Sequence, residues 1–219
     1  MELKQKLVEQ IRAQFGRPTG LWGGLAGCVM AHRSSNRRRN AWAVSLLEVE
    51  RGDRVLEIGF GPGVAIRELS RIAVDGRVCG IDHSDVMVRQ AARRNAHDVR
   101  RGRVDLRLGS AERLPAFEAP FDKVLAVNAM PFWDRPAERL AELRRVLRAG
   151  GRIAIAYQPR GPGATDEAAA TMGQEIATAL RDGGFRDVRL ETLGLRPAVV
   201  CALGLNGSAA DAAQGSRAR

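Results

Sequence analysis

Short apolar runs and amphipathic segments follow one another along most of the chain. Runs at 55–58, 77–82, 104–108, 121–128 and 153–157 have the length and the apolar content of strands. Between them, apolar residues recur three and four positions apart, which predicts helices. The expected helices cover 2–15, about 41–51, 64–72, 85–96, 136–149 with a glycine C-cap at 150–151, and 166–180. Strands that alternate with helices predict a parallel α/β sheet.

Composition places this pattern in one globular domain. The chain has 219 residues, of which 45% are hydrophobic and 27% are charged, and these are ordinary values for a soluble protein. No apolar stretch reaches the ~20 residues that cross a bilayer, and residues 1–6 lack a signal-peptide core. We therefore expect a cytoplasmic protein. Three scattered cysteines and three histidines without ligand spacing predict neither a disulfide framework nor a metal site.

The net charge of +10 raises nucleic acid or an anionic membrane surface as partners. The arginines are spread along the chain, and the run Arg37–Arg39 is either a solvated helix face or part of an anion-binding surface. No accessory RNA-binding motif or array of stacking aromatic residues accompanies the charge, so nucleic acid is disfavoured. Peripheral contact with a membrane stays open.

The most informative segment is the glycine turn that follows the first apolar run. Residues 55–63 read Val-Leu-Glu-Ile-Gly-Phe-Gly-Pro-Gly, and an apolar-periodic helix comes next. Strand, glycine turn and helix in this order are typical of a nucleotide-binding α/β sheet, because glycines let a ligand approach the backbone. The dinucleotide pattern has its third glycine five residues after the first, where this chain has Val64. A dinucleotide is therefore disfavoured.

The pattern Glu-x-Gly-x-Gly-x-Gly resembles motif I of the class I S-adenosylmethionine (SAM) dependent methyltransferases. An apolar run then ends in Asp82, where a second strand of such sheets presents a carboxylate to ribose hydroxyls. Segment 109–115 is similar to the family's Gly-Asp-Ala-x-x-Leu-Pro, with Ser110 at the usual acidic position. Segments 121–124 and 142–153 resemble two further family patterns. The resemblance covers about residues 40–205 and favours the small methyltransferase type 11 (UbiE-like) group.

This resemblance implies a Rossmann-like α/β fold with a seven-stranded, mostly parallel sheet, helices on both faces and an antiparallel last strand. We expect the chain to divide into an N-terminal helical cap or lid (1–45), a SAM-binding domain (46–205) and a flexible tail (206–219). SAM is the implied cofactor, and its ammonium group would be attracted by the acid of motif I. The residues expected to bind it are Glu57, Gly59, Phe60, Gly61, Gly63, Asp82, His83, Ser110, Ala111, Glu112, Asn128 and Ala129.

The implied reaction is methyl transfer, in which alignment of the reactants supplies much of the catalysis. A general base is needed only if the acceptor must lose a proton. His32, Asn128 and Tyr157 are polar residues near the expected site, and none of them is assigned as a catalytic residue. The oligomeric state and the methylated atom are not predicted.

Apolar residues near the expected methyl group suggest the kind of acceptor. The predicted acceptor pocket consists of Trp22, Met30, Phe132 and Trp133. Such a pocket would suit a small apolar or aromatic molecule, although Phe132 and Trp133 could equally be core residues. Two other functions stay open: a lipid or quinone methyltransferase that works at a membrane surface, and a regulatory protein that binds SAM without turnover.

Overall fold

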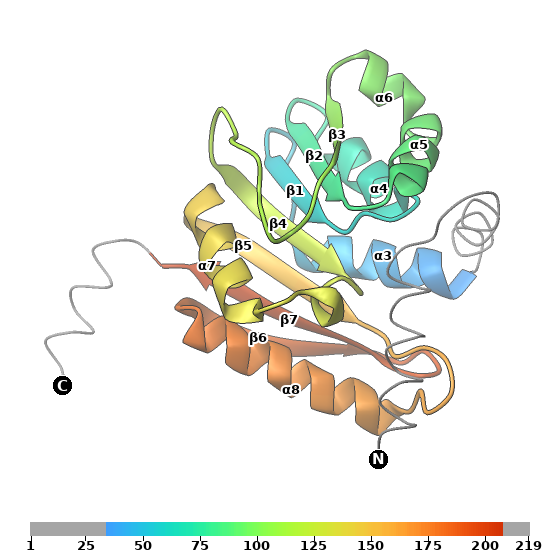
Figure 1. Cartoon of the computed structure of the whole chain (residues 1–219), viewed down its shortest axis with the longest axis vertical. Coiled ribbons are helices and arrows are strands. Elements are labelled where there is room, and N and C mark those ends of the chain that lie inside the picture. The colour runs from blue at the N-terminus through green and yellow to red at the C-terminus, as the bar shows by residue number, and fades with distance from the viewer. Residues whose placement is uncertain (1–33, 208–219) are drawn as a thin grey trace, which may run out of the picture.

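Seven strands form one sheet in the computed structural model, which describes residues 34–207 (Figure 1). The strands are β1 (Arg54–Ile58), β2 (Arg77–Asp82), β3 (Val104–Leu108), β4 (Phe121–Val127), β5 (Leu147–Tyr157), β6 (Phe185–Leu193) and β7 (Val199–Asn206). Their order across the sheet is β3-β2-β1-β4-β5-β7-β6. Strands β1 to β5 pair in parallel, whereas β7 runs antiparallel to both β5 and β6. The predicted sheet, with its antiparallel last strand, is confirmed.

Helices cover both faces of this sheet, as predicted (Figure 1). They are α3 (Ser34–Leu46), α4 (Val64–Ile72), α5 (Asp85–Arg94), α6 (Ala96–Arg100), the short 3-10 helix η1 (Met130–Phe132), α7 (Pro136–Val146) and α8 (Asp166–Asp182). The core beneath α3, α4 and α5 includes Val55 of β1, and the core beneath α7 and α8 includes the next residue, Leu56. Successive strand residues point to opposite faces, so a strand buried on both faces is apolar throughout.

Strand β1 lies where the strand order reverses. It pairs with β2 on one side and with β4 on the other, so that Ile58 is beside both Ile81 and Ala126. Doubly wound sheets bind ligands outside the carboxyl ends of their strands at this reversal. The glycine turn follows β1 there, Asp82 ends β2, and Asn128 follows β4.

The junction between α7 and β5 differs from the prediction. A glycine C-cap at Gly150–Gly151 was expected, but α7 ends at Val146 and β5 begins at Leu147. The buried amide of Asn206 donates hydrogen bonds to the carbonyl oxygens of Arg144 (3.1 Å) and Leu147 (2.7 Å). These bonds satisfy carbonyls that a helix end leaves without partners. Asn206 itself is the last residue of β7 rather than the first residue of a tail.

Two helix boundaries also differ. The helix expected from about residue 41 begins at Ser34 and ends at Leu46. The predicted boundary between cap and domain at residue 45 therefore falls within α3, whose Ala43 and Val44 are buried in the core. The helix expected over 85–96 is divided into α5 and α6 at Asn95.

Residues 1–33 and 208–219 lie outside the described part of the chain, and with them the predicted helix 2–15, most of the predicted cap and nearly all of the predicted tail. Within residues 34–207, no helix is both long enough and apolar enough to span a bilayer. In the same part of the chain, no three His, Cys, Asp or Glu side chains gather as a metal site requires.

Candidate active site

The turn after β1 contains three glycines in the left-handed region of backbone conformation. Gly59, Gly61 and Gly63 have φ angles of 72°, 52° and 73°, which glycine adopts without strain. A Cβ on Gly59 would lie 2.7 Å from Cβ of Ala129, and a Cβ on Gly63 would lie 2.7 Å from Cβ of Ala91. A Cβ on Gly61 would have no heavy atom of the described residues within 4 Å. The outer glycines permit close packing, and Gly61 leaves open space on the side of the turn where a ligand can bind.

Asp82 connects this turn to the end of β2. Its side chain is 5% exposed. Oδ2 accepts a hydrogen bond from the Gly61 N–H (2.8 Å), and Oδ1 accepts one from the Ser84 N–H (2.9 Å). Burial raises the pKa of Asp82, and the two hydrogen bonds offset part of that rise. Because a carboxylate offers about four acceptor positions, both oxygens can still accept hydrogen bonds from the hydroxyl groups of a ligand.

Glu57 is buried beneath the turn and is only 1% exposed. The Ile66 N–H in the first turn of α4 lowers the pKa of this carboxyl, and Oε2 has no hydrogen-bond partner among the described residues. The N-cap residue Gly63 has no side chain to cap the helix. Glu57 therefore lies near the start of α4, at the positive end of its dipole. Its interaction with the ammonium group of a cofactor stays a prediction.

The free energy of unfolding of the Glu57→Gln variant, relative to that of wild type, should increase as the pH rises. Burial, and after it the Asp82 carboxyl, raise the pKa of Glu57 well above its ordinary value. Between the pKa values of the unfolded and folded states, folding takes up a proton, so the wild-type free energy of unfolding falls with rising pH, by at most about 1.4 kcal/mol per unit. Urea unfolding from pH 4.5 to 7.5 measures the difference. A difference that does not change with pH would contradict this assignment.

The segment after β3 is held by α7. The Ser110 hydroxyl accepts a hydrogen bond from the Glu112 N–H (3.1 Å), so it shapes the turn at the position where the family pattern has an acid. The buried Arg139 donates hydrogen bonds to the carbonyl oxygens of Ala111 (3.3 Å) and Glu112. The exposed Glu112 carboxylate is therefore the better candidate for contact with an adenine amine. The sequence analysis did not select Arg139, although an arginine beside Leu140 in an apolar stripe was a usable signal.

Asn128 ties the end of β4 to the end of β5. Its φ of 56° is unusual for a residue with a side chain. Oδ1 accepts a hydrogen bond from the Gln158 N–H (2.8 Å), and Nδ2 donates one to the Gln158 carbonyl (3.2 Å). The Asn128 side chain thus continues the sheet, and the backbone at Ala129 packs against Gly59. Both residues directly follow β4, and Ala129 packs beside the turn; their contact with the cofactor stays a prediction.

Arg39 and Gln158, which the sequence analysis did not select, connect the ends of β4 and β5 to α3. Nη1 of the buried Arg39 donates a hydrogen bond to Gln158 Oε1 (2.7 Å). Burial, and after it the charge of Arg160, lower the pKa of Arg39 to about 9. Asn36 and Asn40 are buried with Arg39. The three polar residues are three and four positions apart, which was the available signal for a buried polar helix face.

Two other predicted cofactor residues lie differently. Phe60 is buried, and its ring occupies the space above Gly80, where an added Cβ would lie 2.6 Å from Cδ1. Only the backbone of Phe60 can therefore face a ligand in the turn. His83 has an exposed side chain, and its Nδ1 lies 3.9 Å from Asp82 Oδ1.

Two of the four residues predicted to line the acceptor pocket are described. Trp133 is 9% exposed and packs in the core with Met130, whereas Phe132 is 44% exposed in η1, directly after the end of β4. Phe132 therefore has apolar surface to offer an acceptor. Outside the described residues lie Trp22, Met30 and His32. Burial, and after it Glu175, raise the pKa of Tyr157, so its phenol stays protonated at neutral pH and is a poor base.

Together these features fit a nucleoside cofactor at the carboxyl ends of β1, β2 and β4. The open side of Gly61 leaves space for a ligand, and the Asp82 carboxylate beside it can accept hydrogen bonds from ribose hydroxyls. The side-chain amide of Asn128 is already bonded to Gln158. The described residues of the site can therefore bind a cofactor and align it for methyl transfer.

Comparisons with known proteins identify the family. A family model described as a methyltransferase domain matches residues 55–151. The uncharacterized methyltransferase YdaC of Bacillus subtilis is 34% identical over 179 residues, which cover 81% of this chain and 96% of that protein.

Solved structures share the fold. A SAM dependent methyltransferase from Aquifex aeolicus has a TM-score of 0.67 at 19% identity, and the match covers 83% of this chain and 97% of that chain. The magnesium protoporphyrin IX methyltransferase of Synechocystis PCC 6803, solved with bound SAM, has a TM-score of 0.59 at 17% identity and covers 91% of each chain. The finer UbiE-like grouping stays a prediction. With this fold, this glycine turn and a close relative matched over nearly its whole length, the chain belongs to the class I SAM-dependent methyltransferases, and SAM is its cofactor.

Proposed function

We propose that the enzyme transfers the methyl group of SAM to a small apolar or aromatic acceptor. The observation that supports this acceptor class is Phe132, an aromatic side chain 44% exposed at the carboxyl end of β4. Burying an exposed aromatic surface against an apolar ligand is favourable, at about 25 cal/mol per Å² of apolar area. The polar side chains of Asp82 and Asn128, by contrast, already make hydrogen bonds within the protein, to the backbone of Gly61 and of Gln158.

SAM supplies a methyl group that is already activated on a positively charged sulfonium. The chain's own residues then bind and align. Asp82 accepts hydrogen bonds from the ribose hydroxyls, the turn at Gly61 accommodates the nucleoside, and Phe132 packs against the acceptor. Alignment of this kind can supply effective molarities of about 10⁵ M and above. No side chain is assigned as a general base.

Phe132→Ala should raise the KM for an aromatic acceptor about 10- to 100-fold and leave the KM for SAM unchanged. The substitution removes an apolar contact that contributes about 1.5–3 kcal/mol, and every 1.4 kcal/mol corresponds to tenfold in affinity. A panel of small phenols and hydroxylated quinones identifies the acceptor, scored by release of S-adenosylhomocysteine. Ile72→Ala is the matched control, since Ile72 is also an exposed apolar residue, 39% exposed at the far end of α4.

The other two functions give different results in the same assay. Turnover only with a quinol embedded in anionic vesicles would favour a membrane-surface enzyme over our proposal. SAM binding without turnover on any acceptor would favour a regulatory protein. An unchanged acceptor KM in the Phe132→Ala variant would remove the acceptor contact that we propose.

A further inference from the structure

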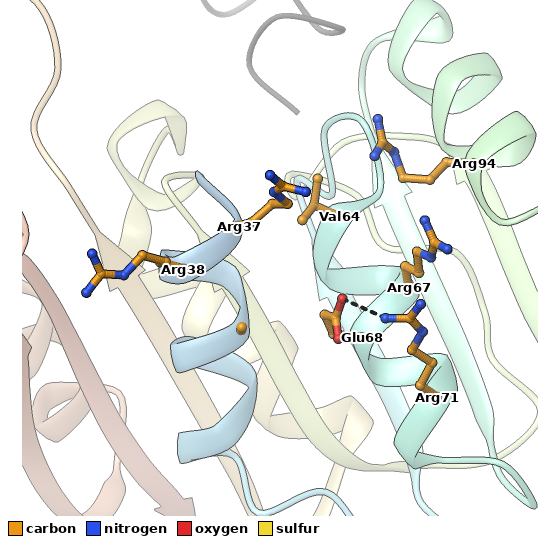
Figure 2. A pocket seen from close by; sticks show the side chains of 8 residues that line it. Arg37, Arg38, Val64, Arg67, Glu68, Arg71 and Arg94 are labelled. Carbon is orange, nitrogen blue, oxygen red and sulfur yellow. Dashed lines mark hydrogen bonds and ion pairs between the residues drawn. The ribbon is translucent and has the colours of Figure 1, made fainter. Parts of the chain in front are cut away.

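A basic pocket lies between α3 and α4, next to the glycine turn (Figure 2). Its volume is about 500 Å³. Arg37 points from α3 toward Val64 at the start of α4, and Arg67, Arg71 and Arg94 line the opposite side (Figure 2). We call this the arginine pocket. Arg38 also contributes to its lining, but its guanidinium points away from the other four.

The described lining of the arginine pocket contains one carboxylate, so its arginines outnumber its acidic groups. The carboxylate belongs to Glu68, which pairs with Arg71 at 3.3 Å. Arg94 Nε donates a hydrogen bond to the Pro62 carbonyl (2.8 Å), so one wall of the pocket is fixed to the glycine turn. The side chains of Arg37 and Arg67 have no hydrogen-bond or ion-pair partner among residues 34–207, and both are exposed.

This distribution of charge is unfavourable without a ligand, because like charges in one concave site repel each other. A guanidinium offers several N–H donors in a planar fork, which matches the oxygens of a phosphate group and permits paired hydrogen bonds. Several such groups around a small volume suit a ligand with several closely spaced negative charges. The described lining contains no aromatic ring on which a nucleic acid base could stack.

From this geometry we propose that the arginine pocket binds a small molecule carrying two or more linked phosphate groups. The site is separate from the predicted ribose site at Asp82, and the inference does not depend on which acceptor is methylated. A diphosphate or triphosphate group brings enough negative charge to neutralise the excess of arginine over glutamate. Arg37 and Arg67 are the residues that the ligand would engage first, since they have no described partner.

Isothermal titration of the full chain with inorganic pyrophosphate, tripolyphosphate and orthophosphate tests the proposal. We expect both linked phosphates to bind more tightly than orthophosphate. The double variant Arg37→Ala and Arg67→Ala should weaken pyrophosphate binding at least about tenfold, because two charge-assisted contacts are lost. Glu68→Gln should strengthen binding, since Glu68 is the carboxylate of the described lining.

The matched control is the double variant Arg93→Ala and Arg100→Ala. Both arginines are exposed on α5 and α6 outside the pocket lining, and their removal changes the net charge by the same amount. Pyrophosphate binding by the control should stay within about twofold of wild type, because distant exposed charges are screened by salt. Equal weakening in both variants, no binding of linked phosphates, or binding only to RNA or to anionic vesicles would each overturn the proposal. SAM titration of the same samples reports separately on the cofactor site.

Discussion

Gly61→Val should abolish SAM binding and leave a folded protein. The φ of 52° is unfavourable for a β-branched residue, at a cost of about 1–3 kcal/mol. Among residues 34–207, no heavy atom lies within 4 Å of the new Cβ, so the side chain would project into the space where we expect the ligand. Wild-type protein with SAM at 100 times Kd gains about 2.7 kcal/mol, which raises Tm by several degrees in a chain of this size. The variant should show no rise.

Gly102→Val separates backbone strain from loss of the ligand's space. Gly102 has a φ of 69°, and its Cβ position is equally open, but it lies between α6 and β3, away from the glycine turn. Both variants should lose comparable free energy of unfolding. SAM should stabilise the Gly102→Val variant as much as wild type. A normal SAM-induced rise in the Gly61→Val variant would mean that the cofactor does not approach this side of the turn.

The sequence predicts the sheet and the turn well because both depend on local patterns. Each central strand is buried on two faces, so apolar runs such as 55–58 mark it directly. The three glycines follow from one backbone path, since the outer two touch Ala129 and Ala91. Asp82 was predicted because it ends the second apolar run, and the structure places it at the end of β2, where Oδ2 accepts a hydrogen bond from the Gly61 N–H. Its contact with ribose stays a prediction.

What the sequence did not predict depends on side-chain hydrogen bonds between distant segments. Asn206 at the end of β7 donates a hydrogen bond to the Leu147 carbonyl at the start of the neighbouring strand β5. This hydrogen bond accompanies the end of α7 at Val146, whereas Gly150 and Gly151 had indicated a later end. Arg39 and Gln158 are 119 positions apart. The periodicity of hydrophobic residues does not predict such pairings. In the sequence, a buried polar residue cannot be distinguished from an exposed one until its hydrogen-bond partner is known.

The role of Glu57 illustrates the same limit within the site. Its position two residues before the first glycine suggested contact with a ligand, and family resemblance supported that expectation. Its side chain is buried beside the Ile66 N–H at the start of α4. An acid at a strand end can interact with a ligand or with the helix that follows, and the residue pattern alone does not distinguish the two. The contact of Glu57 with a ligand stays a prediction.

Asp82→Asn should weaken SAM binding about 10- to 100-fold with little loss of stability. A hydrogen bond to a charged group contributes about 1.5–3 kcal/mol, and every 1.4 kcal/mol corresponds to tenfold in affinity. The amide keeps one oxygen for the Gly61 or the Ser84 N–H, so part of the bridge between the turn and β2 survives. Asp82→Ala would remove both hydrogen-bond acceptors, so a loss of SAM binding could not be separated from a loss of stability. The asparagine variant is therefore the sharper test. Titration with SAM, together with Tm, measures both effects.

Asp105→Asn is the matched control for charge. Asp105 lies in β3, beside β2, and its carboxylate pairs with the half-exposed Arg107 at 2.7 Å. Removing this charge should leave the SAM affinity within about twofold of wild type, because the Asp105 carboxylate bonds to Arg107 of the same strand and, among residues 34–207, makes no hydrogen bond or ion pair with the glycine turn.

If the Asp82→Asn variant bound SAM as wild type does, the carboxylate would act only on the protein's own backbone. If the variant lost SAM affinity and stability in proportion, the hydrogen bond to Gly61, rather than a contact with ribose, would account for the loss of affinity. Loss of affinity alone would assign Asp82 to the cofactor.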